Sequence, residues 1–193
     1  MWEQLLPGLR IKLFMTLLLG VAYPLAMTGI AQALFPHKAN GSLIRVGDKV
    51  IGSEIIAQGF TKPEYFQPRP SAAGTNGYDG TSSAGSQYGP TNKKLMDRVA
   101  ASVEQFRKDN PDYKGPIPAD LVTTSASGLD PHISPQNALA QTPRVAKARG
   151  VSPDQVSQVV AQFTENPDLG VLGEPRVNVL MLNLALDRQI PRR

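Results

Sequence analysis

One short stretch of the chain combines residue types that could carry out chemistry: Asp130-Pro131-His132-Ile133-Ser134. A carboxylate and an imidazole two residues apart could share a proton or a metal ion. The same residue types have ordinary structural uses, because aspartate favours a turn and serine caps a helix. A Ser–His–Asp triad also requires side chains that converge, which close neighbours do poorly. We therefore expect Asp130 and His132 to be structural, with a hydrolytic site as the alternative.

Four further polar residues could bind an anion or an acidic partner: Arg69, Gln141, Arg144 and Arg149. Arginine presents its donors in a fork that matches a carboxylate or a phosphate. Charged side chains at such positions more often face solvent. We therefore expect a solvated surface for these residues, with anion binding as the alternative.

The composition excludes several classes of site. The chain has 193 residues and no cysteine, so disulfides, thiolate metal sites and cysteine nucleophiles are excluded. Its two histidines, His37 and His132, are too few for a multi-histidine zinc site. The net charge of +4 is spread along the chain and gives no reason to expect nucleic acid. No phosphate-binding loop is present. We expect no catalytic residues, no metal site and no tightly bound cofactor.

The elements that position these residues begin with an apolar stretch at 13–35 that contains no Asp, Glu, Lys, Arg or His. A helix over this stretch would reach roughly 34 Å, enough for the roughly 30 Å core of a bilayer. We expect a retained membrane span that also contacts lipid. One alternative is a signal peptide cleaved after Ala31-Gln32-Ala33, which would release a binding domain beginning at Leu34. The other is a buried core helix, which would have to be apolar on all sides.

The span divides the chain into three predicted parts. They are a short head at 1–12, a transmembrane helix at 13–35 and a soluble α+β domain at 36–193. We expect a Gly/Ser-rich loop at 72–92 in this domain to be flexible. Basic residues flank the span on both sides, so charge alone does not set its orientation. Long domains cross membranes largely regardless of charge, and we place the head in the cytoplasm and the domain outside.

Small residues recur along one face of the predicted span. Ala22, Ala26, Gly29 and Ala33 are spaced as i, i+4, i+7 and i+11. Small side chains on one face allow a second membrane helix to approach closely. We therefore predict that these four residues pack against a partner helix. Pro24 has no N–H to donate to residue 20, and we expect it to bend the helix.

Shorter signals predict the elements of the soluble domain. A Gly-Asp pair between two apolar runs predicts a hairpin, Ser-Pro pairs predict helix starts, and Gly150 predicts a helix end. The expected elements are a hairpin at 43–51, helices at 92–110, 134–150 and 152–166, a strand at 121–123 and a last element at 177–187. Alternating apolar residues make a strand possible for the last element, but we favour a helix.

A series of motifs then indicates a family. In order, they are Gly41-Ser42-Leu43-Ile44, Gly52-Ser53, Tyr65-Phe66, Arg69-Pro70-Ser71-Ala72, Gly89-Pro90-Thr91-Asn92, Leu121-Val122-Thr123, Ser127-Gly128-Leu129-Asp130-Pro131-His132-Ile133-Ser134-Pro135, Arg144-Val145-Ala146-Lys147-Ala148-Arg149 and Asn178-Val179 through Leu182-Asn183-Leu184-Ala185-Leu186-Asp187. Together they resemble the C subunit of the Kdp high-affinity potassium-transporting ATPase of bacteria. The likeness covers nearly the whole chain.

This resemblance implies a non-catalytic accessory subunit, needed for assembly and activity, with one span in the inner membrane and a periplasmic domain. Its implied partners are a channel-like, potassium-binding subunit and a catalytic P-type ATPase subunit. Arg69, Asp130, His132, Gln141 and Arg144 lie in or near family motifs without an assigned role. The competing hypothesis is a membrane-anchored periplasmic hydrolase that uses Asp130 and His132.

The same resemblance implies a role for ATP. The complex uses ATP, and the family is described as a catalytic chaperone that raises the ATP affinity of the catalytic subunit. Because ATP is cytoplasmic, a transient contact between ATP and the outer domain would require the opposite topology. An indirect effect requires only that this chain bind some conformations of the pump better than others.

Overall fold

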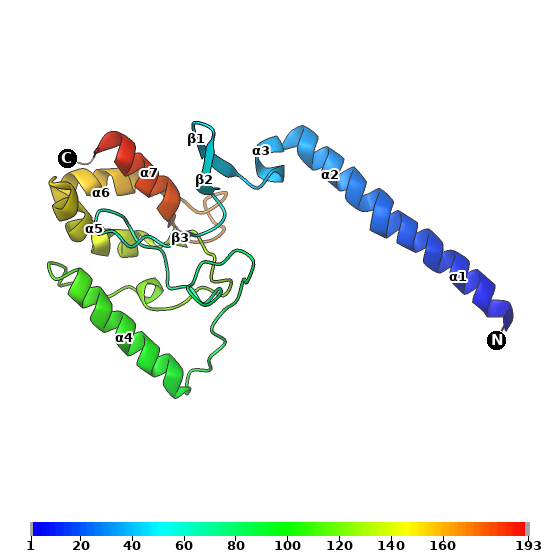
Figure 1. The fold of residues 1–193 in the computed structure, drawn as a ribbon, viewed down its shortest axis with the longest axis horizontal. Coiled ribbons are helices and arrows are strands. Elements are labelled where there is room, and N and C mark those ends of the chain that lie inside the picture. The colour runs from blue at the N-terminus through cyan, green and yellow to red at the C-terminus, as the bar shows by residue number, and fades with distance from the viewer. Residues whose placement is uncertain (1, 192–193) are drawn as a thin grey trace. The chain divides into compact units, whose positions relative to one another are not determined.

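A computed structural model describes residues 2–191 of the chain. It divides into two compact units, Met1–Ile51 and Gly52–Arg193. The first unit holds a long helix, and the second holds most of the mixed helical and stranded structure (Figure 1). The predicted fold class, one N-terminal apolar helix followed by a mixed α+β domain, is confirmed.

The N-terminal helix has three consecutive parts: α1 (Trp2–Leu17), the π-helical turn η1 (Leu18–Ala22) and α2 (Tyr23–Leu34). At the end of η1, the Tyr23 N–H donates to the Leu18 carbonyl, five residues back. A proline ring clashes with the carbonyl four residues before it, and π turns relieve such conflicts inside helices. The helix thus has a wider turn just before Pro24. The predicted bend at Pro24 remains a prediction.

This helix is apolar and is not buried by the rest of the chain. The segment Glu3–Leu34 is long and apolar enough to cross a membrane, and its most apolar window is 0% buried. Because α1 begins at Trp2, the described part of the predicted head is also helical. The predicted boundaries of the span, residues 13 and 35, remain a prediction.

A short helix and a hairpin follow. Helix α3 (Pro36–Ala39) leads into strands β1 (Leu43–Val46) and β2 (Lys49–Ser53), which pair as the predicted hairpin. The turn between the strands contains Gly47 with a φ of +59°, a conformation that glycine adopts without steric cost. The Gly-Asp signal thus identified this turn correctly.

Three helices enclose the core of the second unit: α5 (Pro135–Arg149), α6 (Pro153–Gln162) and α7 (Val179–Gln189). Local sequence sets where they begin and end. The Ser134 side chain accepts the Asn137 N–H at the start of α5, and Ser152 caps α6 in the same way. The core between the helices consists mainly of Phe66, Ile133, Val145, Val156, Val160, Val177, Leu182 and Leu186.

A three-stranded antiparallel sheet lies beside these helices, with β5 (Arg176–Asn178) between β3 (His132–Ile133) and β4 (Thr164–Glu165). His132 pairs with Asn178, and Thr164 pairs with Val177. The last element is therefore a short strand that passes directly into α7. The helix favoured by the sequence is confirmed for Val179–Gln189, and the alternating apolar residues at its start form the strand.

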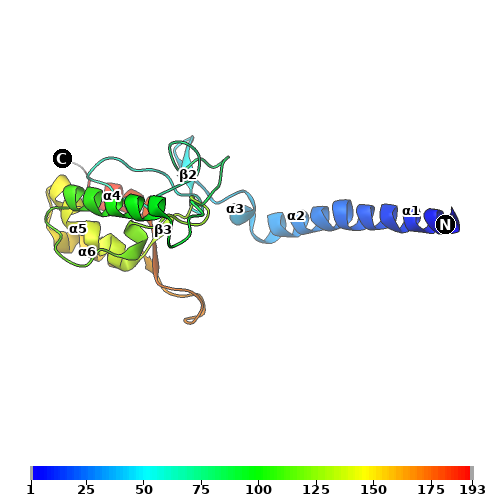
Figure 2. The same ribbon diagram turned by 90° about the horizontal axis from the view of Figure 1, so that it is seen from below.

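The remaining elements are α4 (Lys93–Asp109) and the 3₁₀ turn η2 (Ala119–Leu121). Helix α4 is confirmed, and Figure 2 shows it in green, with α5 and α6 below it in this view. The strand predicted at 121–123 is wrong. The N–H groups of Val122 and Thr123 both donate to the Ala119 carbonyl, so this apolar run closes a turn.

Candidate functional site

The predicted polar residues gather around an irregular segment at 63–71. This segment belongs to no helix or strand, yet Phe66 in its middle is fully buried. Buried backbone groups require hydrogen-bond partners. Here side chains from α5 and α7 supply them.

Two amide side chains pair with the backbone of this segment much as a neighbouring strand would. Asn183 of α7 accepts the Phe66 N–H at 2.8 Å and donates to the Phe66 carbonyl at 2.9 Å. Gln141 of α5 does the same for Gln67, at 2.8 and 3.0 Å. Gln141 also donates to Asn137 at 2.7 Å. Both amide side chains therefore stabilise the fold by satisfying the backbone of this segment.

Arg144 holds the beginning of the segment. Its guanidinium donates to the carbonyls of Pro63 at 2.7 Å and Tyr65 at 2.9 Å. It also donates to Asn110 Oδ1 at 3.0 Å and Gln141 Oε1 at 2.6 Å. Burial lowers the pKa of Arg144 to about 10, although the charge of Asp109 opposes the change.

Arg149, the last residue of α5, also holds this segment. It donates to the carbonyls of Glu64 and Ile190 and to Asp187 Oδ1, each at 2.9 Å. Its guanidinium also lies 5.4 Å from the centre of the Tyr65 ring. The solvent-facing surface predicted for these arginines is therefore wrong. Arg144 is only 8% exposed and Arg149 only 3%, because the 63–71 segment covers this side of α5.

Arg69, Asp130 and His132 meet near the end of the segment. Arg69 Nη1 lies 3.2 Å from Asp130 Oδ2, and Asp130 Oδ1 accepts the backbone N–H of His132 at 3.0 Å. The His132 Nδ1 is 3.5 Å from the same oxygen. Burial acts to raise the pKa of Asp130. The hydrogen bonds from His132 and the charge of Arg69 outweigh the effect of burial, so the pKa is lowered.

Ser134 is occupied elsewhere. Its hydroxyl donates to Asp120 Oδ1 at 3.0 Å and accepts the Asn137 N–H that caps α5. Its backbone N–H and the Asn137 side chain both donate to Asp120 Oδ2. Asp130 therefore forms an ion pair with Arg69, and Ser134 caps α5. This arrangement does not relay a proton from His132 to a serine nucleophile.

A cavity of about 560 Å³ opens beside Arg69 and Asp130 and is also lined by Ile55, Ser127 and Leu129. The Nε of Arg69 is buried and makes no hydrogen bond within residues 2–191. An acidic group could be held there, but both charged residues already pair with each other. Within the described part of the chain, no cluster of three His, Asp or Glu residues could hold a metal ion.

The predicted flexible loop at 72–92 is irregular and contacts the rest of the domain near its start and near its middle. Ala73 is fully buried, and the Ala84 N–H donates to the Ser127 carbonyl at 3.0 Å. A Cβ on Gly128 would come within 2.8 Å of the Ala73 backbone. Glycine at 128 thus allows these loops to approach closely. The flexibility of the loop remains a prediction.

The small residues of the predicted contact face are exposed on the long helix. Ala22 ends η1, while Ala26, Gly29 and Ala33 lie in α2, and all four are exposed. A Cβ built on Gly29 meets no atom within 4 Å. Nothing in this helix requires glycine at that position, so the face is available to a partner.

Sequence reasoning overlooked the structural roles of the buried residues Asn110, Asn137 and Asn183 and of the half-buried Asp120. A signal was present for Asn183, which interrupts the apolar run Leu182-Asn183-Leu184 in a helix. A buried amide in such a position needs hydrogen-bond partners. Its partner, the backbone of Phe66, is distant in sequence and gives no local signal.

Comparisons with known proteins assign the chain to a family. The family described as "KdpC: K+-transporting ATPase, c chain" matches residues 5–188. Among similar proteins, the "Potassium-transporting ATPase KdpC subunit" of Myxococcus xanthus is 57% identical over 98% of this chain and 90% of its own length. The proteins of the same name from Rhodospirillum rubrum and Caulobacter vibrioides are 56% and 54% identical, and each match covers 99% of this chain and 98% and 96% of theirs, respectively. The chain therefore belongs to the KdpC family.

Proposed function

We propose that this chain is a non-catalytic accessory subunit of a high-affinity, ATP-driven potassium uptake complex, needed for assembly and activity. The observation that carries the proposal is the match to the potassium-transporting ATPase C chain over residues 5–188. The polar networks support it, because Gln141, Arg144 and Asp130 serve the fold of the domain.

In this proposal the chain crosses the inner membrane once, with its N-terminus in the cytoplasm and the second unit in the periplasm. The apolar, exposed helix Glu3–Leu34 supports a span. The partners are the channel-like subunit that binds potassium and the P-type subunit that uses ATP. The face made by Ala22, Ala26, Gly29 and Ala33 packs against a helix of the channel-like subunit, because small side chains let helix backbones approach closely.

The proposed effect on ATP affinity is indirect. A periplasmic domain has no access to a cytoplasmic nucleotide, so no ATP contact by the domain is required. If the chain binds one conformation of the pump better than another, it raises the population of that conformation. When that conformation also binds ATP more tightly, the coupling appears as a higher ATP affinity.

The test is purification of the full chain from native membranes in mild detergent through a C-terminal tag, followed by mass spectrometry. We expect a P-type ATPase and a potassium-channel-like protein to co-purify. The mass of the chain also tests retention of the span, because release of a binding domain would leave a chain that begins at Leu34. A chain recovered intact and alone would refute the accessory role.

The helix face is tested with a matched pair of variants in the same purification. Gly29→Leu and Ala26→Leu place a bulky side chain on the proposed contact face, and we expect them to release the chain from its partners. Ala31→Leu is the control, because at about 100° per residue it lies on the opposite side of the helix. Equal co-purification of Gly29→Leu and Ala31→Leu would rule out this face.

A further inference from the structure

The connection between β4 and β5 presents apolar side chains to solvent. Leu169 is 90% exposed, Val171 is 80% exposed and Leu172 is 58% exposed. Figure 2 shows this connection, drawn in orange, extending away from α5 and α6. Single exposed apolar residues are common on protein surfaces. Three within four consecutive positions form a continuous patch, here called the apolar tip, and such patches mark interaction sites.

The backbone of the apolar tip is held in place by its own hydrogen bonds. Asp168 and Leu172 exchange two backbone hydrogen bonds, each 2.9 Å long, and the Gly170 N–H donates to the Pro167 carbonyl at 2.9 Å. The side chains are therefore presented in a set conformation. Binding by a preorganised loop avoids most of the entropic cost of ordering it.

Leu169 adopts a backbone conformation that leucine disfavours. Its φ is +55°, in the left-handed region where bulky side chains are uncommon and glycine is free of strain. The isolated domain gains little from this leucine, because the side chain contacts mostly water. Strained residues persist where the surrounding structure or a function requires them. The exposed leucine points to a contact that forms outside this chain.

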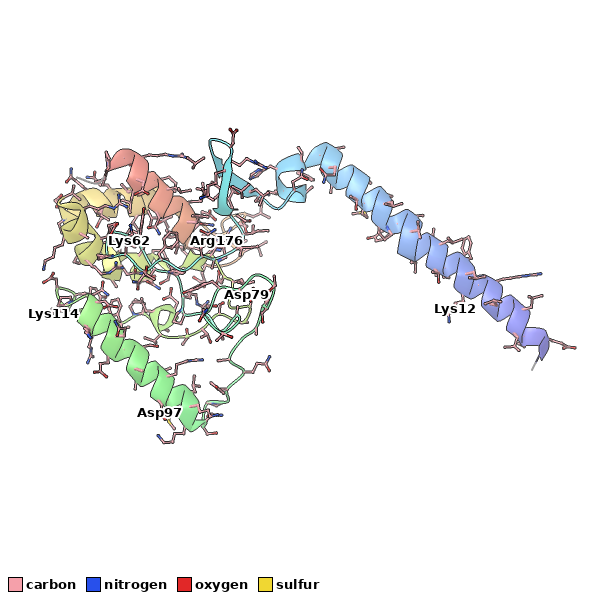
Figure 3. All side chains as sticks on the ribbon, in the orientation of Figure 1. Lys12, Lys62, Asp79, Asp97, Lys114 and Arg176 are labelled. Carbon is pink, nitrogen blue, oxygen red and sulfur yellow. The ribbon has the colours of Figure 1, made fainter. Side chains whose placement is uncertain are left out.

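Acidic groups surround the apolar tip. At its base Arg176 pairs with Glu165 at 2.9 Å and lies 3.6 Å from Asp168 (Figure 3, where Arg176 is labelled). The hydrogen bond from Arg176 to Glu165 raises the pKa of the arginine. Glu174 is exposed on the other side of the tip. Arg176 is thus shared between two carboxylates, and residues 165–176 have more acidic than basic side chains, so the rim of the tip has a net negative charge.

This chemistry favours a protein partner over a lipid surface. Segments that bind bilayers use Trp or Tyr at the interface and Lys or Arg toward anionic headgroups. Residues 166–175 contain no aromatic and no basic residue, and they include Asp168 and Glu174. An anionic bilayer would repel this rim, whereas a protein pocket with basic residues around its edge would complement it.

We propose that the apolar tip inserts into an apolar pocket with a basic rim on another protein subunit of the potassium-transporting complex. This inference rests on the proposed function. Leu169 and Val171 supply the buried anchor, while Asp168 and Glu174 pair with the rim. The tip then forms a contact between the outer domain and the complex that is independent of the helix face at Gly29.

The absence of cysteine from the chain makes a direct test possible. Val171→Cys places a single thiol on the apolar tip, and Glu104→Cys places one on the exposed side of α4 as the control. The rate of N-ethylmaleimide labelling is measured for the full chain alone in detergent, in phosphatidylethanolamine/phosphatidylglycerol vesicles and in the purified complex. We expect the complex to slow labelling at 171 at least tenfold and to leave labelling at 104 unchanged.

Several results would overturn the inference. Equal labelling at 171 in the chain alone and in the complex would show that no subunit covers the tip. Protection at 171 by vesicles alone would assign the tip to lipid, and protection in the isolated chain would assign it to a second copy. If the wild-type chain brings no ATPase subunit with it, the proposed function fails and the inference fails with it.

A second variant separates binding from folding. Leu169→Gly removes the side chain and also relieves the unfavourable φ, so the domain should melt at the wild-type temperature or above it. We expect the complex purified with this variant to dissociate at least tenfold faster. Unchanged dissociation would count against the tip as an anchor. Glu174→Lys should likewise weaken the complex, and a stronger complex would contradict the basic rim.

Discussion

Replacing Arg144 tests whether the side-chain network holds the 63–71 segment in place. Arg144→Met keeps an unbranched stem of similar length and removes the four hydrogen bonds of the guanidinium. Gln141 keeps another partner, the Gln67 N–H. The carbonyls of Pro63 and Tyr65 lose the hydrogen bonds that the guanidinium donates to them. The effect should therefore arise mainly from these two backbone groups.

The size of the effect follows from burial. An unsatisfied buried polar group costs about 1–3 kcal/mol, so two carbonyls give roughly 2–6 kcal/mol. Breaking a buried charged network by removing one partner costs about 3–5 kcal/mol. We expect a loss of about 3–5 kcal/mol in the free energy of unfolding of the second unit. For a domain of this size that corresponds to a fall of roughly 6–20 °C in the melting temperature.

The assay is thermal unfolding of the full chain in detergent, followed by near-ultraviolet circular dichroism. Lys147→Met is the matched control on the same helix. Its side chain is 74% exposed and pairs with Asp112 at 3.1 Å, a surface contact worth about 1 kcal/mol or less. If Arg144→Met and Lys147→Met melt at the same temperature, the network does not hold the segment and the reasoning is refuted.

Two further predictions concern the same network. Asn183→Leu keeps the number and branching of the side-chain heavy atoms but removes the hydrogen bonds to the Phe66 N–H and carbonyl. Urea unfolding should therefore show a loss of roughly 2–4 kcal/mol in the free energy of unfolding; a change below about 0.5 kcal/mol would contradict the pairing. Because the folded-state pKa of Asp130 is lowered, its stabilising contribution is present above the unfolded pKa, about 3.9, and is lost as pH falls through the folded value. Unfolding measured from pH 2 to 6 should be less pH-dependent for Asp130→Asn than for wild type, and identical profiles would contradict the coupling to Arg69 and His132.

The parts of the fold that local sequence determines were predictable. Ser134-Pro135 and Gly150 mark the two ends of α5, and the helix has these ends. Gly47-Asp48 marks the turn of the hairpin between β1 and β2. In each case one or two residues set the backbone conformation by capping or by permitting a positive φ. The apolar helix was equally clear because its signal is a long, uncharged run.

The parts that depend on distant partners were not predictable. The strand at 176–178 exists because Asn178 pairs with His132 and Val177 pairs with Thr164. Within residues 2–191 the apolar run at 121–123 pairs with no strand, and it closes a turn. A two- or three-residue strand carries too little periodicity to be recognised without its neighbours.

The candidate site shows the same division. The sequence predicts a solvated surface for Arg144 and Arg149, because nothing local indicates that residues 63–67 cover them. The covering segment has no regular structure, so its backbone needed donors and acceptors from side chains. The sequence thus identifies the polar residues of the site. Only the tertiary contacts show that these residues stabilise the fold.

The central claim is that this chain is an accessory subunit of a potassium-transporting ATPase complex. It is tested most directly by the ATPase activity that co-purifies with the chain. The measurement is ATP hydrolysis, with and without potassium, by the material eluted through a C-terminal tag on the full chain. We expect hydrolysis that potassium stimulates, that survives His132→Ala and that is lost from the eluate of Gly29→Leu. An intact wild-type chain eluted without potassium-stimulated hydrolysis would contradict the claim. Hydrolysis lost with His132→Ala while the subunits remain assembled would instead favour a catalytic role for this chain.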